Sequence, residues 1–480
     1  MFERLKICAV AGAALALSAC AGLDKAPARP DVTLPAAYPG AAASAGGVDA
    51  RWWELYRDET LAALLREALE KNRDVRIAAA RIVEARALIG PADLARLPQV
   101  SVGADGSRQQ LSQNGQFVFA PGQDRRLSLY GASVNLSYEA DVWGRVSSLA
   151  QAARADFLAT SYAAETVRIA LIADVAGAYF DILVLRGEVR YTREALATRE
   201  KFLDLTRRRH EGGRASLADV ARAESSLAQA RARLPQLELA AAQTANRLAV
   251  LVGRGLADPA ALVPAAATLP AAPEVPAGLP SSLLERRPDI LSAGQELLGA
   301  SSRVRAQRAA LLPTLSLTGV LGTQSRELGD LFTGPAGRWS LGLSLLAPLL
   351  DAQRNRYQVE AQEARELQAA LRYEKAVENA FREVSDALVA RVRQAEARAA
   401  SEAQVRSLTR LADIAVKRYE AGITSYFEVV DAQTELLNAQ INAAESQRSL
   451  LAATVQLYKA LGGGWDPQGV RAAQADSASR

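Results

Sequence analysis

The feature that most restricts the fold of this 480-residue chain is a long segment without helix-breaking residues. Between Leu349 and Gly422 there is neither proline nor glycine, and the segment is dense in Ala, Leu, Glu, Gln and Arg. These residues lose least free energy on entering a helix. At about 1.5 Å per residue, one helix over 354–418 would be roughly 98 Å long. The segment 145–209 has the same length and also ends in a glycine turn, so the sequence predicts two such helices.

The two long segments belong to an internal duplication. Residues 72–75 (Asn-Arg-Asp-Val) correspond to 287–290 (Arg-Pro-Asp-Ile), a shift of 215 positions (289 − 74 = 215). Residues 97–101 and 312–316 show the same shift, whereas the long segments differ by 209 (354 − 145 = 209). The two halves therefore differ in length in the loop between their two predicted strands. Each half predicts the order helix, strand, strand, long helix, turn, helix, which makes the fold mainly α with a small β part.

Part of each half alternates between apolar and polar residues with a period of two. In the clearest case the apolar positions are Tyr130, Ala132, Val134, Leu136 and Tyr138. This pattern is typical of an outer-membrane strand with one lipid face, and we interpret Tyr130, Tyr138 and the repeat-related Trp339 as aromatic residues at the membrane interfaces. A half-buried strand of a soluble sheet alternates in the same way, so the pattern by itself allows both interpretations.

Two strands in each half give four strands per chain, which are too few to close a barrel. Because an open sheet edge is not tolerated in hydrocarbon, membrane strands would have to be shared between copies. Two copies would give a barrel filled by side chains, and three would give twelve strands with a lumen. We therefore expect a homotrimeric, 12-stranded outer-membrane β-barrel. The long helices exceed the membrane thickness of about 30 Å, so we expect them to continue the barrel as a long periplasmic α-helical barrel.

The N-terminus has the pattern of a lipoprotein signal peptide. Arg4 and Lys6 precede an apolar run that ends in the tetrapeptide Leu17-Ser18-Ala19-Cys20, which resembles the lipobox of bacterial lipoproteins. The apolar run is too short to span a bilayer. We expect cleavage before Cys20 and a covalent lipid on its sulfur, with Ala21 favouring the outer membrane. A plain secretory signal with a chance cysteine is the alternative.

These observations divide the chain into six segments. The expected boundaries are a signal peptide at 1–19, a lipidated tether at 20–50, a first repeat at 51–255, a linker at 256–280 with six prolines, a second repeat at 281–465, and a disordered tail at 466–480. Strands are expected at about 99–110, 127–139, 313–323 and 339–347. Pro91 and Pro98 are expected to end the first helix, and Pro235 to interrupt the returning helix of the first repeat.

Composition argues against an enzyme. His210 is the only histidine, and the mature body keeps no cysteine, so a His/Cys metal site or a Cys–His nucleophile is not available. No glycine-rich phosphate loop follows a strand. The formal net charge of +4 is spread along the chain, which gives no basic stripe for nucleic acid. No metal is expected, and no cofactor beyond the lipid on Cys20.

Several ordered segments resemble the TolC-type outer-membrane factor family, also called outer membrane efflux proteins. The segments are Trp52–Leu55, Asn72–Val75, Arg81–Ala87, Asp141–Arg145, Arg287–Ile290, Leu312–Leu315 and Arg418–Gly422. The lipidated, NodT-like branch that serves multidrug and metal efflux is the most similar. The resemblance implies a trimeric channel in the outer membrane of a Gram-negative bacterium. It also implies a periplasmic adaptor (membrane fusion) protein and an inner-membrane transporter of the RND type as partners, with small molecules or metal ions as cargo.

The resemblance also gives roles to residues near the two glycine turns. The tip that contacts the adaptor would comprise Arg209, His210, Gly212, Gly213, Ser216, Arg418, Tyr419, Gly422 and Ser425. Simple helix C-caps explain the same residues. One turn inside each tip, Asp204 and Asp413 would form the acidic ring of a periplasmic gate, with Arg208 and Lys417 as neighbours. Ordinary i,i+4 ion pairs, Asp204 with Arg208 and Asp413 with Lys417, are the alternative.

Two other functions are compatible with parts of this pattern. A channel for type I protein secretion would share the fold and differ in cargo. A periplasmic coiled-coil protein without transport activity would explain the long helices, but it leaves the duplicated strands without a purpose. We expect the first interpretation, an outer-membrane channel for efflux of small molecules.

Overall fold

The computed structural model describes residues 30, 49–112, 125–256, 259–265, 267–275, 283–348 and 351–465. Its helices are α2 (Glu59–Lys71), α3 (Arg73–Leu94), α4 (Arg145–Glu211), α5 (Leu217–Val252), α6 (Leu283–Arg286), α7 (Pro288–Ala309), α8 (Ala352–Glu420) and α9 (Tyr426–Ala460). Its strands are β1 (Gln99–Gln110), β2 (Arg126–Ala140), β3 (Thr314–Ser325) and β4 (Gly337–Leu346). The predicted signal peptide with Cys20, nearly all of the tether and the tail from 466 lie outside the described residues.

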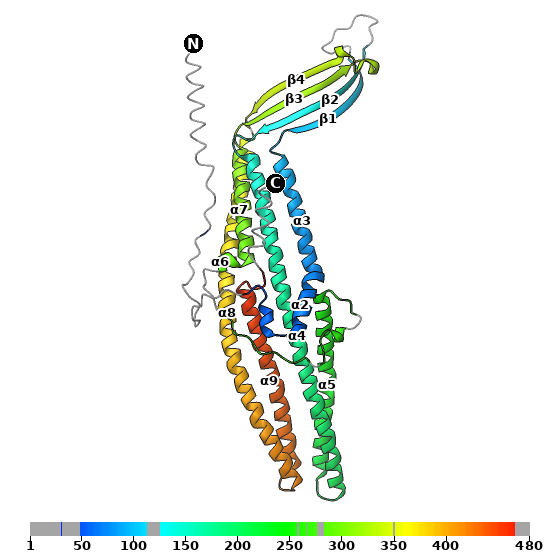
Figure 1. The fold of residues 1–480 in the computed structure, drawn as a ribbon, viewed down its shortest axis with the longest axis vertical. Coiled ribbons are helices and arrows are strands. Elements are labelled where there is room, and N and C mark those ends of the chain that lie inside the picture. The colour runs from blue at the N-terminus through cyan, green and yellow to red at the C-terminus, as the bar shows by residue number, and fades with distance from the viewer. Residues whose placement is uncertain are drawn as a thin grey trace. The chain divides into compact units, whose positions relative to one another are not determined.

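The two long helices of the prediction are present. Helix α4 has 67 residues and α8 has 69, so each is about 100 Å long. Both are single, uninterrupted helices (Figure 1). Each half of the chain has the expected order of helix, two strands, long helix, turn and helix, which confirms the duplication. Among the described helices, none has the length and apolar character that a membrane-spanning helix needs.

The chain forms two compact units, and each half of the duplication contributes to both. The sheet unit comprises the described parts of Met1–Pro30, Ile82–Thr160 and Ala293–Tyr373. The helical unit comprises the described parts of Asp31–Arg81, Ser161–Ser292 and Glu374–Arg480. The repeats are therefore halves of the sequence and not separate compact bodies.

The sheet unit contains one antiparallel sheet in the order β1-β2-β3-β4 (Figure 1). Val100 lies opposite Leu136 in the β1–β2 pair, and Leu136 lies opposite Gly319 in the β2–β3 pair. Gly319 in turn lies opposite Leu341 of β4. The two hairpins, one from each half of the sequence, thus join through β2 and β3 into a continuous sheet whose outer edges are β1 and β4.

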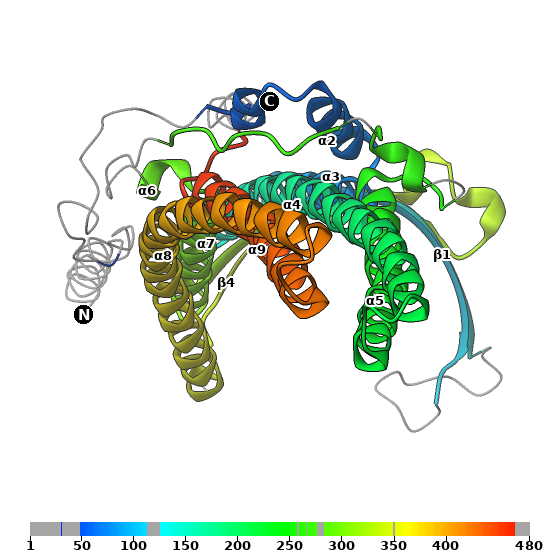
Figure 2. The same cartoon turned by 90° about the horizontal axis from the view of Figure 1, so that it is seen from below.

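The helical unit is built from two helix pairs, α4 with α5 and α8 with α9, which lie side by side in Figure 2. Ion pairs connect α4 to α5, such as Arg193 with Glu238 at 2.6 Å. A hydrophobic core surrounds the short helix Trp52–Tyr56. There Trp52 stacks on Tyr458 of α9, with 4.7 Å between the ring centroids. The core also contains Tyr56, Leu61, Leu65, Ile172, Tyr179, Phe180, Leu248 and Leu451.

The predicted effects of Pro91 and Pro235 are wrong, because both prolines lie inside continuous helices. The first helical segment breaks at Asn72, whose Oδ1 accepts hydrogen bonds from the backbone N–H groups of Asp74 and Val75 at 2.7 and 3.2 Å. Helix α3 then continues through Pro91 to Leu94. Just beyond that proline, Asp93 pairs with Arg154 of α4 at 3.0 Å, so a tertiary contact supports the turn that proline would weaken.

Pro235 likewise lies inside a continuous α5. The helix is tied to α4 on both sides of this proline, by Arg231 to Glu200 at 2.8 Å and by Glu238 to Arg193 at 2.6 Å. These two ion pairs hold the helix against α4 on both sides of the position where proline removes a backbone hydrogen bond. Sequence propensity alone does not include this support.

Candidate functional site

One face of the four-stranded sheet is apolar and exposed. Residues directly opposite each other in antiparallel strands share a face, so the register assigns every strand residue to a side. The apolar side carries Val100, Val102, Tyr130, Val134, Leu136, Tyr138, Leu315, Leu317, Leu321, Trp339, Leu341, Leu343 and Leu345. The other side carries Gln99, Ser101, Asp105, Ser133, Asn135, Ser137, Ser316, Thr318, Ser340 and Ser344.

The exposure of this apolar face decides between the two interpretations of the alternating pattern. Trp339 and Leu341 are 78% and 75% exposed, and Val102 is 83% exposed. A soluble half-buried sheet would cover these side chains with a second layer. The strands have 10 to 15 residues, which is long enough to cross a bilayer at a tilt. Tyr130, Tyr138 and Trp339, the predicted interface aromatics, all lie on this face.

The two glycine turns of the helical unit are the same structural motif. Gly213 and Gly422 adopt φ of +71° and +75°, a left-handed conformation that glycine tolerates without strain. The N–H of Arg214 donates to the carbonyl of Arg209 at 2.7 Å, and the N–H of Ile423 donates to that of Arg418 at 2.9 Å. These six-to-one bonds define Schellman caps. The chain then re-enters a helix at Ser216 and at Ser425, which are the N-caps of α5 and α9.

Arg209 connects the two turns, although it lies 210 residues from its partner. Its Nη1 donates to the carbonyl oxygen of Tyr419 at 3.0 Å, and its guanidinium lies 4.2 Å from the centre of the Tyr419 ring. Tyr419 is buried and packs against Tyr426 and Phe202, with ring centroids 5.5 and 6.3 Å apart. The structure thus brings Arg209 and Tyr419 together and places the tyrosine ring in the core of the tip.

The other predicted tip residues are at the surface or bond locally. The Nδ1 of His210 lies 2.9 Å from the carbonyl oxygen of Ala215, inside the first turn. Arg418 pairs with Glu428 at 3.3 Å beside the second turn. The sequence reasoning missed the exposed apolar residues of this region, which are Leu217, Ile423 and Phe427. The sequence could have indicated them, because they are apolar residues beside a glycine turn, where polar residues are usual.

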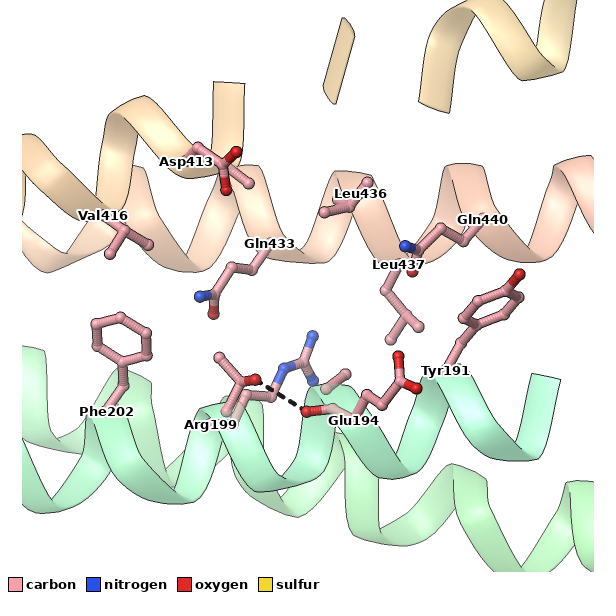
Figure 3. A pocket seen from close by; sticks show the side chains of 13 residues that line it. Tyr191, Glu194, Arg199, Phe202, Asp413, Val416, Gln433, Leu436, Leu437 and Gln440 are labelled. Atoms are coloured by element: carbon pink, nitrogen blue, oxygen red, sulfur yellow. Dashed lines mark hydrogen bonds between the residues drawn. The ribbon is translucent and has the colours of Figure 1, made fainter. Parts of the chain in front are cut away.

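The two candidate gate aspartates have different surroundings. Asp204 forms the i,i+4 ion pair with Arg208 at 2.9 Å, and both side chains are exposed. Asp413 and Lys417, although both are described, do not approach within ion-pair distance. Asp413 instead lines a cavity between α4, α8 and α9 (Figure 3). The alternative interpretation, an i,i+4 ion pair, therefore fits Asp204 and does not fit Asp413.

This cavity has a volume of about 370 Å³ and contains a residue that the sequence reasoning missed, Arg199. The Arg199 side chain is 4% exposed. It donates to the carbonyl of Ser226 on α5 at 2.8 Å and to the hydroxyl of Thr434 on α9 at 3.2 Å. Burial lowers the pKa of its guanidinium. The sequence offers no signal for it, since arginine is common along all the long helices.

Helix α4 also buries an acid. Glu188 is 4% exposed, and burial and the neighbouring Glu445 of α9 raise its pKa to about 7. Arg233 and Arg448 act in the opposite direction. Within the described residues, no group of three or more His, Cys, Asp or Glu side chains could hold a metal ion.

A duplicated helix–strand–strand–helix chain with an exposed apolar sheet face and paired helical turns defines the class of outer-membrane channels with a long helical part. The model of the family "Outer membrane efflux protein" matches residues 64–254 and 279–463, one match in each half of the duplication. The chain belongs to this family, whose members are channels and not enzymes. It is an outer-membrane channel component of an efflux pump.

Individual relatives agree with this assignment. The toluene efflux pump outer membrane protein TtgC and the antibiotic efflux pump outer membrane protein ArpC, both of Pseudomonas putida, are each 36% identical over 438 residues. The alignments cover 90% of this chain and 89% of each relative. Among solved structures, the outer-membrane channel OprN matches with a TM-score of 0.84 and 28% identity, over 91% of this chain and 99% of that one.

Proposed function

We propose that three copies of this chain form one duct, which receives small molecules from a periplasmic adaptor and an inner-membrane transporter and releases them outside the cell. The observation that carries this proposal is the exposed apolar face that runs across all four strands. Such a face is stable in lipid, but the sheet still has open edges at β1 and β4. Those edges have to be paired within hydrocarbon.

Pairing between copies supplies the missing partners. If β1 of one copy pairs with β4 of the next, the contact is heterologous, and it closes into a ring when the rotation fits. Three copies give twelve strands and a lumen, with the serine- and asparagine-bearing face inside. Apolar side chains exposed on the helices also favour contacts between copies. They are Val83, Leu88 and Leu94 on α3, and Tyr357, Leu367, Leu371, Val389 and Val392 on α8.

The paired turns are the proposed adaptor contact. Leu217, Ile423 and Phe427 expose apolar surface around the Schellman caps, and such surface favours a protein partner. Arg209 holds the two turns in one arrangement through Tyr419. A partner would therefore meet a preformed surface and lose little conformational entropy on binding. The transporter behind the adaptor is proposed to be of the RND type.

The aspartates are proposed to form the gate. Asp204 and Asp413 are both exposed and lie one turn inside the caps, so a trimer would carry six such carboxylates. A ring of carboxylates favours cations and raises the barrier for anions. Arg208 pairs with Asp204, and Lys417 is the candidate cation one turn from Asp413.

Cys20 is proposed as the lipid anchor, because the Leu-Ser-Ala-Cys tetrapeptide follows a short apolar run. One acyl-type anchor gives only weak attachment by itself. It would add to the attachment that the strands provide. The proposed location is the outer membrane of a Gram-negative bacterium, with the helical unit in the periplasm.

The proposed cargo is small molecules. TtgC and ArpC are named for toluene and for antibiotics, and a duct lined by small polar side chains need not bind its cargo specifically. Type I protein secretion is the alternative cargo class, and none of the relatives reported above is named for it.

The stoichiometry and conductance of the purified full-length protein test this proposal. Native mass spectrometry in detergent is expected to give three chains, and planar bilayers are expected to show discrete conductance steps. As a matched pair, Leu343→Asp on the apolar face should abolish bilayer insertion, and Ser344→Asp on the polar face should preserve it. A monomer or dimer that conducts, or equal insertion of the two variants, would contradict the shared-sheet arrangement.

A further inference from the structure

The charge of Arg199 has no counter-ion within the described part of the chain. Its two hydrogen-bond acceptors, the Ser226 carbonyl and the Thr434 hydroxyl, are neutral. These bonds use two of the five N–H groups of the guanidinium. Buried charges in proteins are normally paired, since removing a lone ion from water is costly. An arginine that is 4% exposed and lacks a carboxylate within ion-pair distance therefore indicates a missing anionic partner.

The cavity beside Arg199 has room for such a partner. Figure 3 shows Arg199 and Phe202 of α4 pointing toward Gln433 and Leu437 of α9 across the cavity. A volume of about 370 Å³ is at the lower end for small-molecule sites. The cavity lies wholly inside the helical unit.

The lining defines the chemistry of the ligand. The apolar side chains are Ala195, Phe202, Ala412, Val416, Leu436 and Leu437. Amide groups come from Gln433 and Gln440, and the guanidinium from Arg199. An arginine fork matches the two oxygens of a carboxylate, and apolar walls match a hydrocarbon or aromatic body.

Two acidic residues restrict the ligand charge. Glu194 and Asp413 also line the cavity, and both are exposed. They would repel phosphate or a dicarboxylate more strongly than a singly charged anion. Neither forms an ion pair with Arg199 in the structure. The lining thus favours one negative charge on an otherwise apolar molecule.

We propose that the cavity between α4, α8 and α9 binds a small amphipathic monocarboxylate, whose carboxylate pairs with Arg199 and whose apolar body packs against Phe202 and Leu437. The ligand would join the first repeat, which provides α4, to the second repeat, which provides α8 and α9. The cavity shares Asp413 with the proposed gate, whereas Arg199, Phe202 and Leu437 have no role in that gate. The proposal does not depend on the number of copies or on the cargo.

Benzoate is a suitable probe, with benzamide as its neutral counterpart of the same shape. Isothermal titration of the purified full-length protein is expected to give one benzoate site per chain and binding of benzamide at least tenfold weaker. Arg199→Gln should weaken benzoate binding at least tenfold. Arg207→Gln is the matched control, because Arg207 is exposed on the same helix and pairs with Glu224 outside the cavity. It should leave the affinity within twofold of the wild type.

A second variant separates the loss of the site from a folding defect. Leu436→Trp fills the cavity and leaves Arg199 and both of its hydrogen bonds in place, so it should also lose benzoate, with an unchanged circular dichroism spectrum. Absence of benzoate binding to the wild type, equal binding of benzoate and benzamide, or wild-type affinity in Arg199→Gln would each overturn the proposal. Displacement of benzoate by an equal concentration of chloride would overturn the amphipathic class and indicate an inorganic anion site.

Discussion

At the scale of single residues, Glu188 is an acid in a position that opposes its charged form. Its side chain is 4% exposed on α4, and its Oε1 has no hydrogen-bond partner among the described residues. The groups around it are Glu445 and Arg448 of α9 and Arg233 of α5. Burial comes first among the causes of its raised pKa, and the like charge of Glu445 comes second. Glu188 is therefore a proton-binding group in the middle of a structural helix.

This arrangement predicts a pH dependence of stability. The pKa of Glu188 rises from 4.5 to about 7 in the folded state, so between these values the folded protein binds more protons than the unfolded one. The free energy of unfolding must then fall as pH rises, by up to about 3 kcal/mol per chain for this one group. Glu188→Gln cannot ionise. We expect the variant to gain stability relative to the wild type from pH 5 to pH 8, measured by chemical unfolding.

The matched control for this prediction is Glu200→Gln on the same helix. Glu200 is exposed and pairs with Arg231 of α5, so its loss should leave the pH dependence of the wild type intact. A wild-type slope in Glu188→Gln would show that this carboxyl does not titrate between pH 5 and 8.

At the scale of elements, helix α8 ends in a cap that helix α4 completes. Helix α8 leaves the carbonyls of its last turn without intrahelical partners. The Schellman bonds from Gly422 and Ile423 satisfy two of these carbonyls. Arg209 of α4 adds bonds to the carbonyls of Tyr419 and Glu420 at 3.0 and 3.4 Å. The end of one repeat is thus stabilised by a cation from the other.

Removing this contact should loosen the end of α8 selectively. Arg209→Gln loses two hydrogen bonds and the contact with the Tyr419 ring, together worth about 1–2 kcal/mol. Amide hydrogen exchange at Gly422 and Ile423 should therefore accelerate about tenfold. Arg208→Gln loses only an exposed ion pair with Asp204 and should leave these amides unchanged. Equal exchange in the two variants would mean that Arg209 does not hold the cap.

At the scale of the whole molecule, the proposed trimer repeats each feature of the chain three times around one axis. The two aspartates of each chain give six carboxylates. The two open sheet edges of each chain, β1 and β4, pair between neighbours and form three seams. The carboxylates of Asp204 and Asp413 differ in their ion pairing, since Asp204 pairs with Arg208 and Asp413 has no cation within ion-pair distance among the described residues. An acidic ring with only part of its charge balanced would attract multivalent cations.

This ring predicts a change in conductance. The double variant Asp204→Ala with Asp413→Ala should raise the single-channel conductance and weaken block by multivalent cations such as hexamminecobalt, measured in planar bilayers. Glu238→Ala removes an exposed carboxylate of α5 that pairs with Arg193, and it should behave like the wild type. Unchanged conductance and block in the double variant would remove these aspartates from the gate.

Local patterns in the sequence were sufficient for much of the fold. The absence of proline and glycine determined the length of α8, and a period of two determined which side of β2 is apolar. The glycines of the turns, repeated 209 positions apart, determined where both long helices end. These features depend on interactions between neighbours in the chain, so they can be predicted before any packing is known.

Tertiary packing decided the rest. Helix α5 continues through Pro235 because α4 supports it on both sides, and Tyr419 is buried because Phe202 and Arg209 lie against it. The cavity at Arg199 exists only where α4 meets α8 and α9. Each of these features depends on a neighbour from another helix, and for Tyr419 and the cavity that neighbour lies some 200 residues away in the sequence. The role of a charged residue such as Arg199 therefore depends on its tertiary neighbours, which come from α5 of its own repeat and α9 of the other.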